Sequence, residues 1–278
     1  MPSRRAIIVA ALAAGLLVTG RAAAQEREHA HGDEGHVHAH GGFPEYVDLF
    51  FTHHAYLERK VHPRFDAVVA EAGNQYSESL EFVWQFNRWL GAEVEAALIQ
   101  SDPDLGEGVS GFGDLEVAPM VALVQDPARL LIVTARSGFV LPTGDEDEGL
   151  GVDGWGWEPG LLIWKGLGAE GRGALQAEIG YGRTFANEGV DEEELAFNLG
   201  YSYWTHSNWI PVAEIHAVER LGEHEEGALA DRQLSGTLGF RYAFANGQQW
   251  GAAVQLPLLG DTESYDWRVV IGGIIHLQ

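Results

Sequence analysis

The sequence predicts an all-β protein, a transmembrane antiparallel up-and-down β-barrel of about 12 strands. Three observations predict this class. Long segments alternate apolar and polar residues with a period of two, as strands with two different faces do. Their connections alternate between short turns and longer acidic loops, an asymmetry typical of membrane barrels. Beyond the N-terminus, no apolar run reaches about 18 residues, which excludes membrane-spanning helices there.

The composition of the 278-residue chain excludes several function classes. The chain has no Cys, so a disulfide framework, thiolate zinc sites and cysteine catalysis are ruled out. The formal net charge is −24, with 17 Lys and Arg against 41 Asp and Glu. This balance predicts no nucleic-acid partner, because contacts to phosphates need a basic face.

Residues 1–24 have the pattern of a secretory signal peptide. A basic start precedes an apolar run over 6–18, and Ala22 and Ala24 stand at positions −3 and −1 of a cleavage site before Gln25. An uncleaved membrane anchor is the alternative, but the run is short for a span. We therefore expect export with cleavage of this segment.

Residues 25–54 are predicted to form a His-rich periplasmic N-terminal segment. Imidazoles beside carboxylates are ligands for zinc, copper and nickel, and H-x-H spacing lets two rings reach one ion. The alternative is a solvated low-complexity leader without a ligand role. We expect no required cofactor, and weak binding of Zn, Cu or Ni at His29, His31, His36, His38 and His40.

Residues 55–278 are predicted to form the barrel. Over 193–203, for example, Leu195, Phe197 and Leu199 face one way and the small or polar residues between them face the other. Most of these segments have the length of about 9–11 residues that a tilted membrane-spanning strand needs. The predicted strands are 55–69, 76–87, 90–100, 112–124, 129–142, 155–165, 172–185, 193–204, 208–219, 232–244, 248–258 and 265–277.

The connections give the barrel two different ends. Those after the second, fourth, eighth and tenth strands are short, and Asn246-Gly247 in the last of them is a hairpin signal. An even strand number leaves both termini at the short-turn end, which is periplasmic in outer-membrane barrels. The acidic loops are then extracellular. Their candidate residues are Asp145, Glu146, Asp147, Glu148, Glu192, Glu193 and Glu194.

Aromatic residues near the strand ends favour a membrane barrel over a soluble β-sandwich or lipocalin-like protein. They match the aromatic girdles of membrane barrels. The chain departs from the usual pattern in ending on Gln278 and not on an aromatic residue. The girdle candidates are Trp89, Trp155, Trp157, Trp204, Trp209, Trp250, Tyr265 and Trp267.

The inward faces carry candidate pore-lining charges. Two interpretations are open. The charges pair with one another across the interior and have no further role, or they form an acid-rich pore that favours cations. A barrel of this strand number is narrow enough to be occluded. His53 and His54 are expected at the periplasmic rim. The pore-lining candidates are Glu81, Glu93, Glu95, Glu116, Arg136, Glu158, Glu178, Glu214, His216, Arg241 and Arg268.

Two short motifs resemble those of a known family. Gly111-Phe112-Gly113-Asp114 and Leu141-Pro142-Thr143-Gly144-Asp145 are similar to a strand motif and a strand-end motif of outer-membrane β-barrel transporters, including the meta-pathway of phenol degradation type. Residues 55–60 are similar to the family's first strand. The resemblance covers most of 50–278. It implies an outer-membrane location and passage of small solutes, and it implies no particular substrate.

These observations predict an outer-membrane channel or transporter for small solutes, linked to metals or to hydrophobic compounds. A metal-binding component that uses the His-rich segment and a structural barrel without transport are the alternatives. The sequence contains no G-x-S-x-G, H-E-x-x-H or P-loop motif, so we expect no enzyme. The expected partners are outer-membrane lipid, lipopolysaccharide, and small solutes or cations. The oligomeric state is left open.

Overall fold

The structure is a computed structural model of the full chain. It describes residue 43 and residues 46–104, 107–168, 171–187, 190–205, 207–221, 232–259 and 265–277. All of them belong to one compact unit, residues 38–278. In the described part of the chain, no helix is long and apolar enough to cross a membrane.

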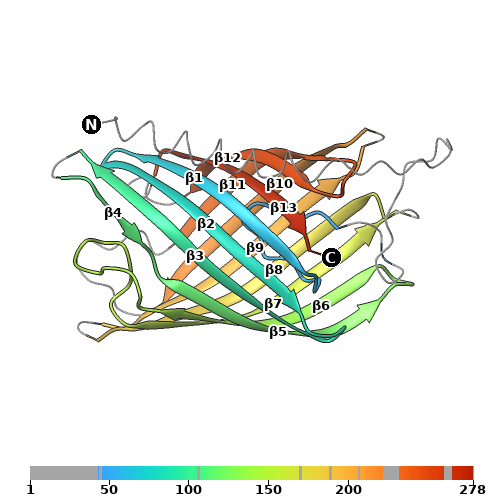
Figure 1. Ribbon diagram of the computed structural model, residues 1–278, viewed down its shortest axis with the longest axis horizontal. Coiled ribbons are helices and arrows are strands. Elements are labelled where there is room, and N and C mark those ends of the chain that lie inside the picture. The colour runs from blue at the N-terminus through green and yellow to red at the C-terminus, as the bar shows by residue number, and fades with distance from the viewer. Residues whose placement is uncertain are drawn as a thin grey trace. The chain divides into compact units, whose positions relative to one another are not determined.

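All regular elements in the described residues are strands (Figure 1). Each predicted strand has a counterpart, and most bounds agree within a few residues. The exception is the first strand, which begins at Lys60 and not at 55. The strands are β1 (Lys60–Ala70), β2 (Gly73–Gln85), β3 (Leu90–Pro103), β4 (Val109–Phe112), β5 (Leu115–Asp126), β6 (Leu131–Leu141), β7 (Trp155–Leu167), β8 (Gly173–Phe185), β9 (Glu192–Tyr203), β10 (Trp209–Leu221), β11 (Arg232–Ala243), β12 (Gln249–Leu259) and β13 (Trp267–His276).

The strands form one antiparallel sheet that closes on itself. Strands adjacent in sequence pair with each other, except that β4 and β5 both pair with β3, and β1 also pairs with β13, with Lys60 opposite His276. The pairing of β2 with β3 completes the ring. Closure leaves no long edge of unpaired backbone groups, which is the condition for a sheet to stand in lipid. The predicted up-and-down barrel is confirmed.

The strands β4 and β5 together occupy one place in the wall. Leu98–Ser101 of β3 pair with β4, and Leu90–Glu95 pair with β5. The wall therefore has the 12 positions that the sequence predicts, one of them interrupted at Gly113 and Asp114.

The two ends of the barrel differ in their connections. At the end where β1 begins and β13 finishes, here called the terminus-side end, the turns are short, such as 86–89 and 127–130. At the opposite, loop-side end the connection 142–154 is long. The tight turn 71–72 between β1 and β2 is an exception at this end. The predicted asymmetry is present, and the first hairpin departs from it.

The wall has an apolar outer face and a polar inner face. On β9, Leu195, Phe197 and Leu199 are 37–45% exposed, whereas Ser202 is 1% exposed and faces inward. Among the predicted girdle residues, Trp89, Trp155 and Trp209 are exposed. Trp204 differs, because it packs against the buried Val47 and Ile210. An apolar exterior that alternates with a polar interior is the pattern of barrels surrounded by lipid.

Candidate functional site

Residues 46–59, here called the inner segment, lie inside the barrel and contact side chains from around the wall. The sequence predicts a periplasmic segment over 25–54 and a first strand that begins at residue 55. In the structure 46–54 lie within the barrel, and 55–59 are not part of the strand ladder. The strand ladder starts only at Lys60, opposite Val83 and His276. Before that point the chain turns inward, and Ala55 and Tyr56 are buried.

Carbonyl groups of the inner segment accept hydrogen bonds from wall side chains. Gln249 Nε2 donates to the carbonyl of Tyr46 at 2.9 Å, and Gln176 Nε2 donates to that of Val47 at 2.6 Å. Arg241 donates to the carbonyls of Asp48 and Leu49 at 2.6 and 2.8 Å. Arg64 Nη1 and Thr134 Oγ1 donate to the carbonyls of Phe50 and Ala55. These bonds replace a strand ladder, because buried backbone groups need partners.

Two wall carboxylates accept the backbone N–H groups of the same segment. Glu214 of β10 accepts from Phe50 N at 2.8 Å, from Phe51 N at 3.1 Å, and from both the N–H and the hydroxyl of Thr52 at 3.0 and 2.9 Å. Glu178 of β8 accepts from His53 N at 3.2 Å. Hydrogen bonds to an ionised acceptor contribute about 1.5–3 kcal/mol each, so Glu214 is the strongest single anchor of the segment.

Apolar contacts support these bonds near the terminus-side end. Tyr46 stacks on Tyr56 with ring centroids 4.0 Å apart, and Trp164 of β7 meets Tyr46 edge-on at 5.3 Å. A second cluster joins Leu49 and Phe50 to Val212, Ala253 and Val270 of the wall. The inner segment is therefore packed on its apolar side and hydrogen-bonded on its polar side.

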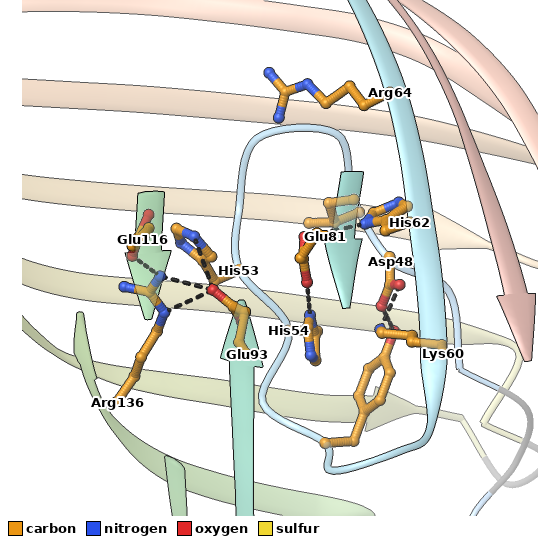
Figure 2. A network of polar contacts seen from close by, with 12 residues as sticks. Asp48, His53, His54, Lys60, His62, Arg64, Glu81, Glu93, Glu116 and Arg136 are labelled. Atoms are coloured by element: carbon orange, nitrogen blue, oxygen red, sulfur yellow. Dashed lines mark hydrogen bonds and ion pairs between the residues drawn. The ribbon is translucent and has the colours of Figure 1, made fainter. Parts of the chain in front are cut away.

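Buried ion pairs surround the segment (Figure 2). Asp48 pairs with Lys60 Nζ and accepts the Tyr56 hydroxyl. Arg136 of β6 bonds Glu93 Oε1 through Nε at 3.1 Å and Nη2 at 2.7 Å. The same guanidinium also pairs with Glu116 of β5.

A further pair of guanidinium groups lies nearer the middle of the lumen. Asp66 of β1 bonds Arg64 at 2.6 Å and Arg268 of β13 at 2.8 Å. Both guanidinium groups also lie over the ring of Phe51, at 4.7 and 4.5 Å from its centroid. Cation–π contacts of this kind hold the tip of the inner segment.

The adjacent His53 and His54 differ in charge. Burial opposes protonation of both rings. For His53 the carboxylate of Glu178, with Nδ1 to Oε1 at 2.9 Å, outweighs burial and raises the pKa to about 10. For His54 burial and the nearby Lys60 lower the pKa to about 3. His53 is thus a cation and His54 is neutral at neutral pH. Both lie inside the barrel and not at its rim, because the apolar and polar contacts of 46–59 draw them inward.

Most of the predicted pore-lining residues meet the inner segment or its ion pairs. Glu178, Glu214 and Arg241 bond its backbone, and His216 reaches the same network through Asn198, with Nδ1 to Oδ1 at 3.0 Å. The members placed around the ion pairs are Glu81, Glu93, Glu116, Arg136 and Arg268.

Glu158 of β7 lies toward the loop-side end. It is within Coulombic reach of the acidic Glu116 and Glu194 and of the cations Arg136 and His53. Among the described residues, neither Glu158 nor Glu194 forms a hydrogen bond or salt bridge. Glu95 is half-buried on β3 and contributes negative charge near Arg64.

The prediction that an acidic loop contains Glu192, Glu193 and Glu194 is wrong. These residues are the first three of β9. They pair with Thr184, Arg183 and Gly182 of β8. The ladder extends this far because Arg183 pairs with Glu193 at 3.1 Å and with Asp191 at 2.8 Å, and its hydrogen bond lowers the pKa of Asp191. Asp145, Glu146, Asp147 and Glu148 do lie in the connection 142–154. His29, His31, His36, His38 and His40 lie outside the described residues, and their metal binding stays a prediction.

The two short motifs of the sequence meet at the loop-side end. Asp114, in the break between β4 and β5, accepts hydrogen bonds from Thr143 N and Gly144 N through Oδ1, at 2.9 and 2.8 Å. Its Oδ2 accepts from Val152 N at 2.7 Å. The aspartate therefore closes the base of the long connection. A Cβ on Gly144 would stand 2.5 Å from the Leu150 carbonyl oxygen, which requires a glycine there.

Several residues that hold the inner segment are not among the site residues that the sequence predicts. They are Lys60, Arg64, Asp66, Gln176 and Gln249. The apolar run from Tyr46 to Phe51 was a usable signal, because aromatic residues are out of place in a solvated tail.

A closed antiparallel barrel with an apolar exterior and a charged lumen defines the class of outer-membrane β-barrels. The model of the family described as "Putative MetA-pathway of phenol degradation" matches residues 61–265, and the chain belongs to this family. A comparison with curated protein sequences gave no match.

Solved structures share the fold at low sequence identity. The COG4313 outer membrane channel from Pseudomonas putida F1 has a TM-score of 0.60 and 14% identity, covering 84% of this chain and 100% of its own. The NanC porin has a TM-score of 0.57 and 9% identity, covering 77% and 100%. The translocator domain of the autotransporter NalP from Neisseria meningitidis has a TM-score of 0.52 and 12% identity, covering 81% and 90%.

Proposed function

We propose that the chain forms an outer-membrane channel for small solutes, obstructed by its inner segment and opened when that segment moves. One observation carries the proposal: a closed wall encloses a charged lumen in which residues 46–59 are held by side chains and not by strand pairing. Such bonds break one at a time, whereas a strand ladder would make the segment part of the wall. The family membership and the structural likeness to proteins named channels and porins support the proposal.

The channel is proposed to favour cations. In the described part of the loop-side lumen Glu158 and Glu194 form no salt bridge, although Arg136 and Arg220 lie within Coulombic reach of them. Asp145–Glu148 add four acidic residues to the long connection. Carboxylates around a pore select cations, and charge at a pore mouth raises the local concentration of counter-ions.

The proposed location is the outer membrane, reached after export and cleavage before Gln25. In the proposed orientation both termini are periplasmic, and Asp145–Glu148 meet divalent cations at the lipopolysaccharide surface. Fractionation of cells, with N-terminal sequencing of the membrane-bound protein, tests the location and the cleavage together. An unprocessed N-terminus or a soluble protein would contradict them.

Conductance of the purified full-length protein in planar bilayers tests the channel. Discrete steps in KCl, with a reversal potential in a salt gradient that favours K⁺, are the expected result. Solute uptake by liposomes that contain the protein should likewise be faster for a small cationic solute than for an anionic solute of equal size. A folded barrel that gives neither steps nor uptake would support a structural barrel.

A further inference from the structure

Three ligand-type side chains converge between the inner segment and the wall. His54 belongs to the inner segment, Glu81 to β2 and Glu93 to β3. One ligand atom of each lies within 4.8 Å of the others. The two carboxylates are on adjacent strands, since Glu93 stands opposite Val83 in the ladder, and Glu81 is two residues away on the same face. Figure 2 shows His54 rising toward Glu81 from the inner segment, with Glu93 beside it.

These same side chains carry buried polar atoms without partners. Glu93 is 2% exposed and His54 is 3% exposed. Among the described residues, His54 Nε2, Glu81 Oε1 and Glu93 Oε2 have no hydrogen-bond partner. His54 presents its other ring nitrogen to the wall, with Nδ1 4.0 Å from Glu81 Oε1. An unsatisfied buried polar group costs about 1–3 kcal/mol, so a ligand that takes up Glu81 Oε1 and Glu93 Oε2 would remove that cost.

The neighbouring charges do not fill this role. The cationic His53 lies with Nε2 4.0 Å from Glu93 Oε1, which is not the unpartnered oxygen. Arg136 bonds the other oxygen of Glu93 and is shared with Glu116. Lys60 is held by Asp48. His62 Nδ1 is 3.4 Å from Glu81 Oε2, so it orients this carboxylate and leaves Oε1 free. A bonded second oxygen on each carboxylate is the arrangement of an outer shell around a metal site.

We propose that His54, Glu81 and Glu93 bind one divalent transition-metal ion, with zinc as the representative ion. An imidazole nitrogen and two carboxylate oxygens suit this class, whereas calcium and magnesium need more oxygen ligands. Zinc binds such atoms at about 2.0–2.2 Å, so the cluster contracts by a few tenths of an ångström or more on binding. A water molecule completes the four-coordinate shell.

The ion would fasten the inner segment to the wall, because one ligand belongs to the segment and two belong to strands. This role rests on the proposed channel: bound metal stabilises the obstructed state. The three proposed ligands are not among the His-rich residues 29–40.

Zinc titration of the full-length protein in detergent tests the site directly. Every variant carries Gln in place of His29, His31, His36, His38 and His40, so that these residues do not compete. We expect one zinc equivalent on this parent protein and at least tenfold weaker binding after His54→Gln or Glu81→Gln. His216→Gln is the matched control, since this buried lumen histidine also lies near a carboxylate and is outside the cluster; its binding should be unchanged.

Two results would overturn the site: no zinc bound by the folded parent, or equal affinity in the parent and in both ligand variants. If His54→Gln does not fold, Glu81→Gln on the wall decides the question. In bilayers, zinc should lower the conductance of the parent, EDTA should restore it, and Glu81→Gln should not respond. Zinc binding without this change would overturn the fastening role. A parent that never conducts would refute the channel, and the titration would still decide the metal site.

Discussion

The two halves of the lumen use charge in opposite ways. In the terminus-side half, Glu214, Glu178 and Arg241 are each bonded to the backbone of the inner segment. In the loop-side half, Glu158 and Glu194 form no hydrogen bond or salt bridge with described residues. Charges of the first kind hold a protein segment, and in the proposed channel charges of the second kind face passing solutes. The wall is continuous through both halves, so the inner segment makes the difference.

The largest change in conductance is expected when Glu214, the main anchor of the inner segment, loses its charge. Glu214→Gln removes the charge that holds three backbone N–H groups and a hydroxyl. A loss of about 3 kcal/mol would change the ratio of held to released segment about a hundredfold. We expect the single-channel conductance or the open fraction to rise several-fold in planar bilayers.

The matched control is Glu158→Gln, which removes a lumen carboxylate that does not touch the segment. The same rise in both variants would show that lumen charge, and not release of the segment, controls conductance. Heat-dependent mobility on gels shows whether each barrel has folded.

A disulfide between the inner segment and the wall should hold the segment inside the lumen. A Cβ on Gly200 of β9 would lie 3.4 Å from Leu49 Cγ, which is the position that the sulfur of a cysteine at 49 would take. The native chain has no Cys, so Leu49→Cys with Gly200→Cys gives a single pair. We expect low conductance when the pair is oxidised and higher conductance after reduction.

Leu49→Cys alone is the control for this pair and should not respond to reductant. Gly200→Cys alone does not serve, because its Cβ would stand 2.1 Å from Leu49 Cδ1. If the oxidised pair conducts as well as the reduced pair, movement of residues near 49 does not open the lumen.

Neutralising the loop-side half should weaken its attraction for cations and leave the inner segment in place. A unit charge about 7 Å from a passing ion in water contributes about 0.6 kcal/mol. Glu158→Gln with Glu194→Gln should therefore lower the preference for K⁺ over Cl⁻ about threefold or more, measured as the reversal potential in a KCl gradient. Glu78→Gln, on β2, is a control carboxylate outside the described ion pairs of the lumen. An unchanged reversal potential in the double variant would show that these two residues do not determine the preference for K⁺ over Cl⁻.

The smallest effect on conductance is expected from a change at Asp114. This residue holds the long connection 142–154 by accepting backbone N–H groups, as Glu214 does for the inner segment. Asp114→Ala leaves the N–H groups of Thr143, Gly144 and Val152 without their acceptor. We expect a glutamate-specific protease to cleave at Glu146 or Glu148 several-fold faster, with little change in conductance. Asp126→Ala, in a terminus-side turn, is the control. Equal cleavage in both variants would show that Asp114 does not hold the connection.

Local pattern fixed most of the wall. The period-two alternation located every strand position, because one face meets lipid and the other meets the lumen. The short motifs contain Asp114 and Thr143, although these residues are 29 positions apart and meet only in the folded barrel. The alternation also placed Glu214 and Arg241 on the inner face.

What those inward residues bind was decided only by the tertiary structure. Glu214 meets Phe50, Phe51 and Thr52 across more than 160 positions of sequence, and no periodicity joins such distant partners. The inner segment has no repeat because its backbone is satisfied by side chains from many strands and not by a neighbouring ladder. The sequence therefore determined the barrel, and only closure of the barrel determined what occupies its lumen.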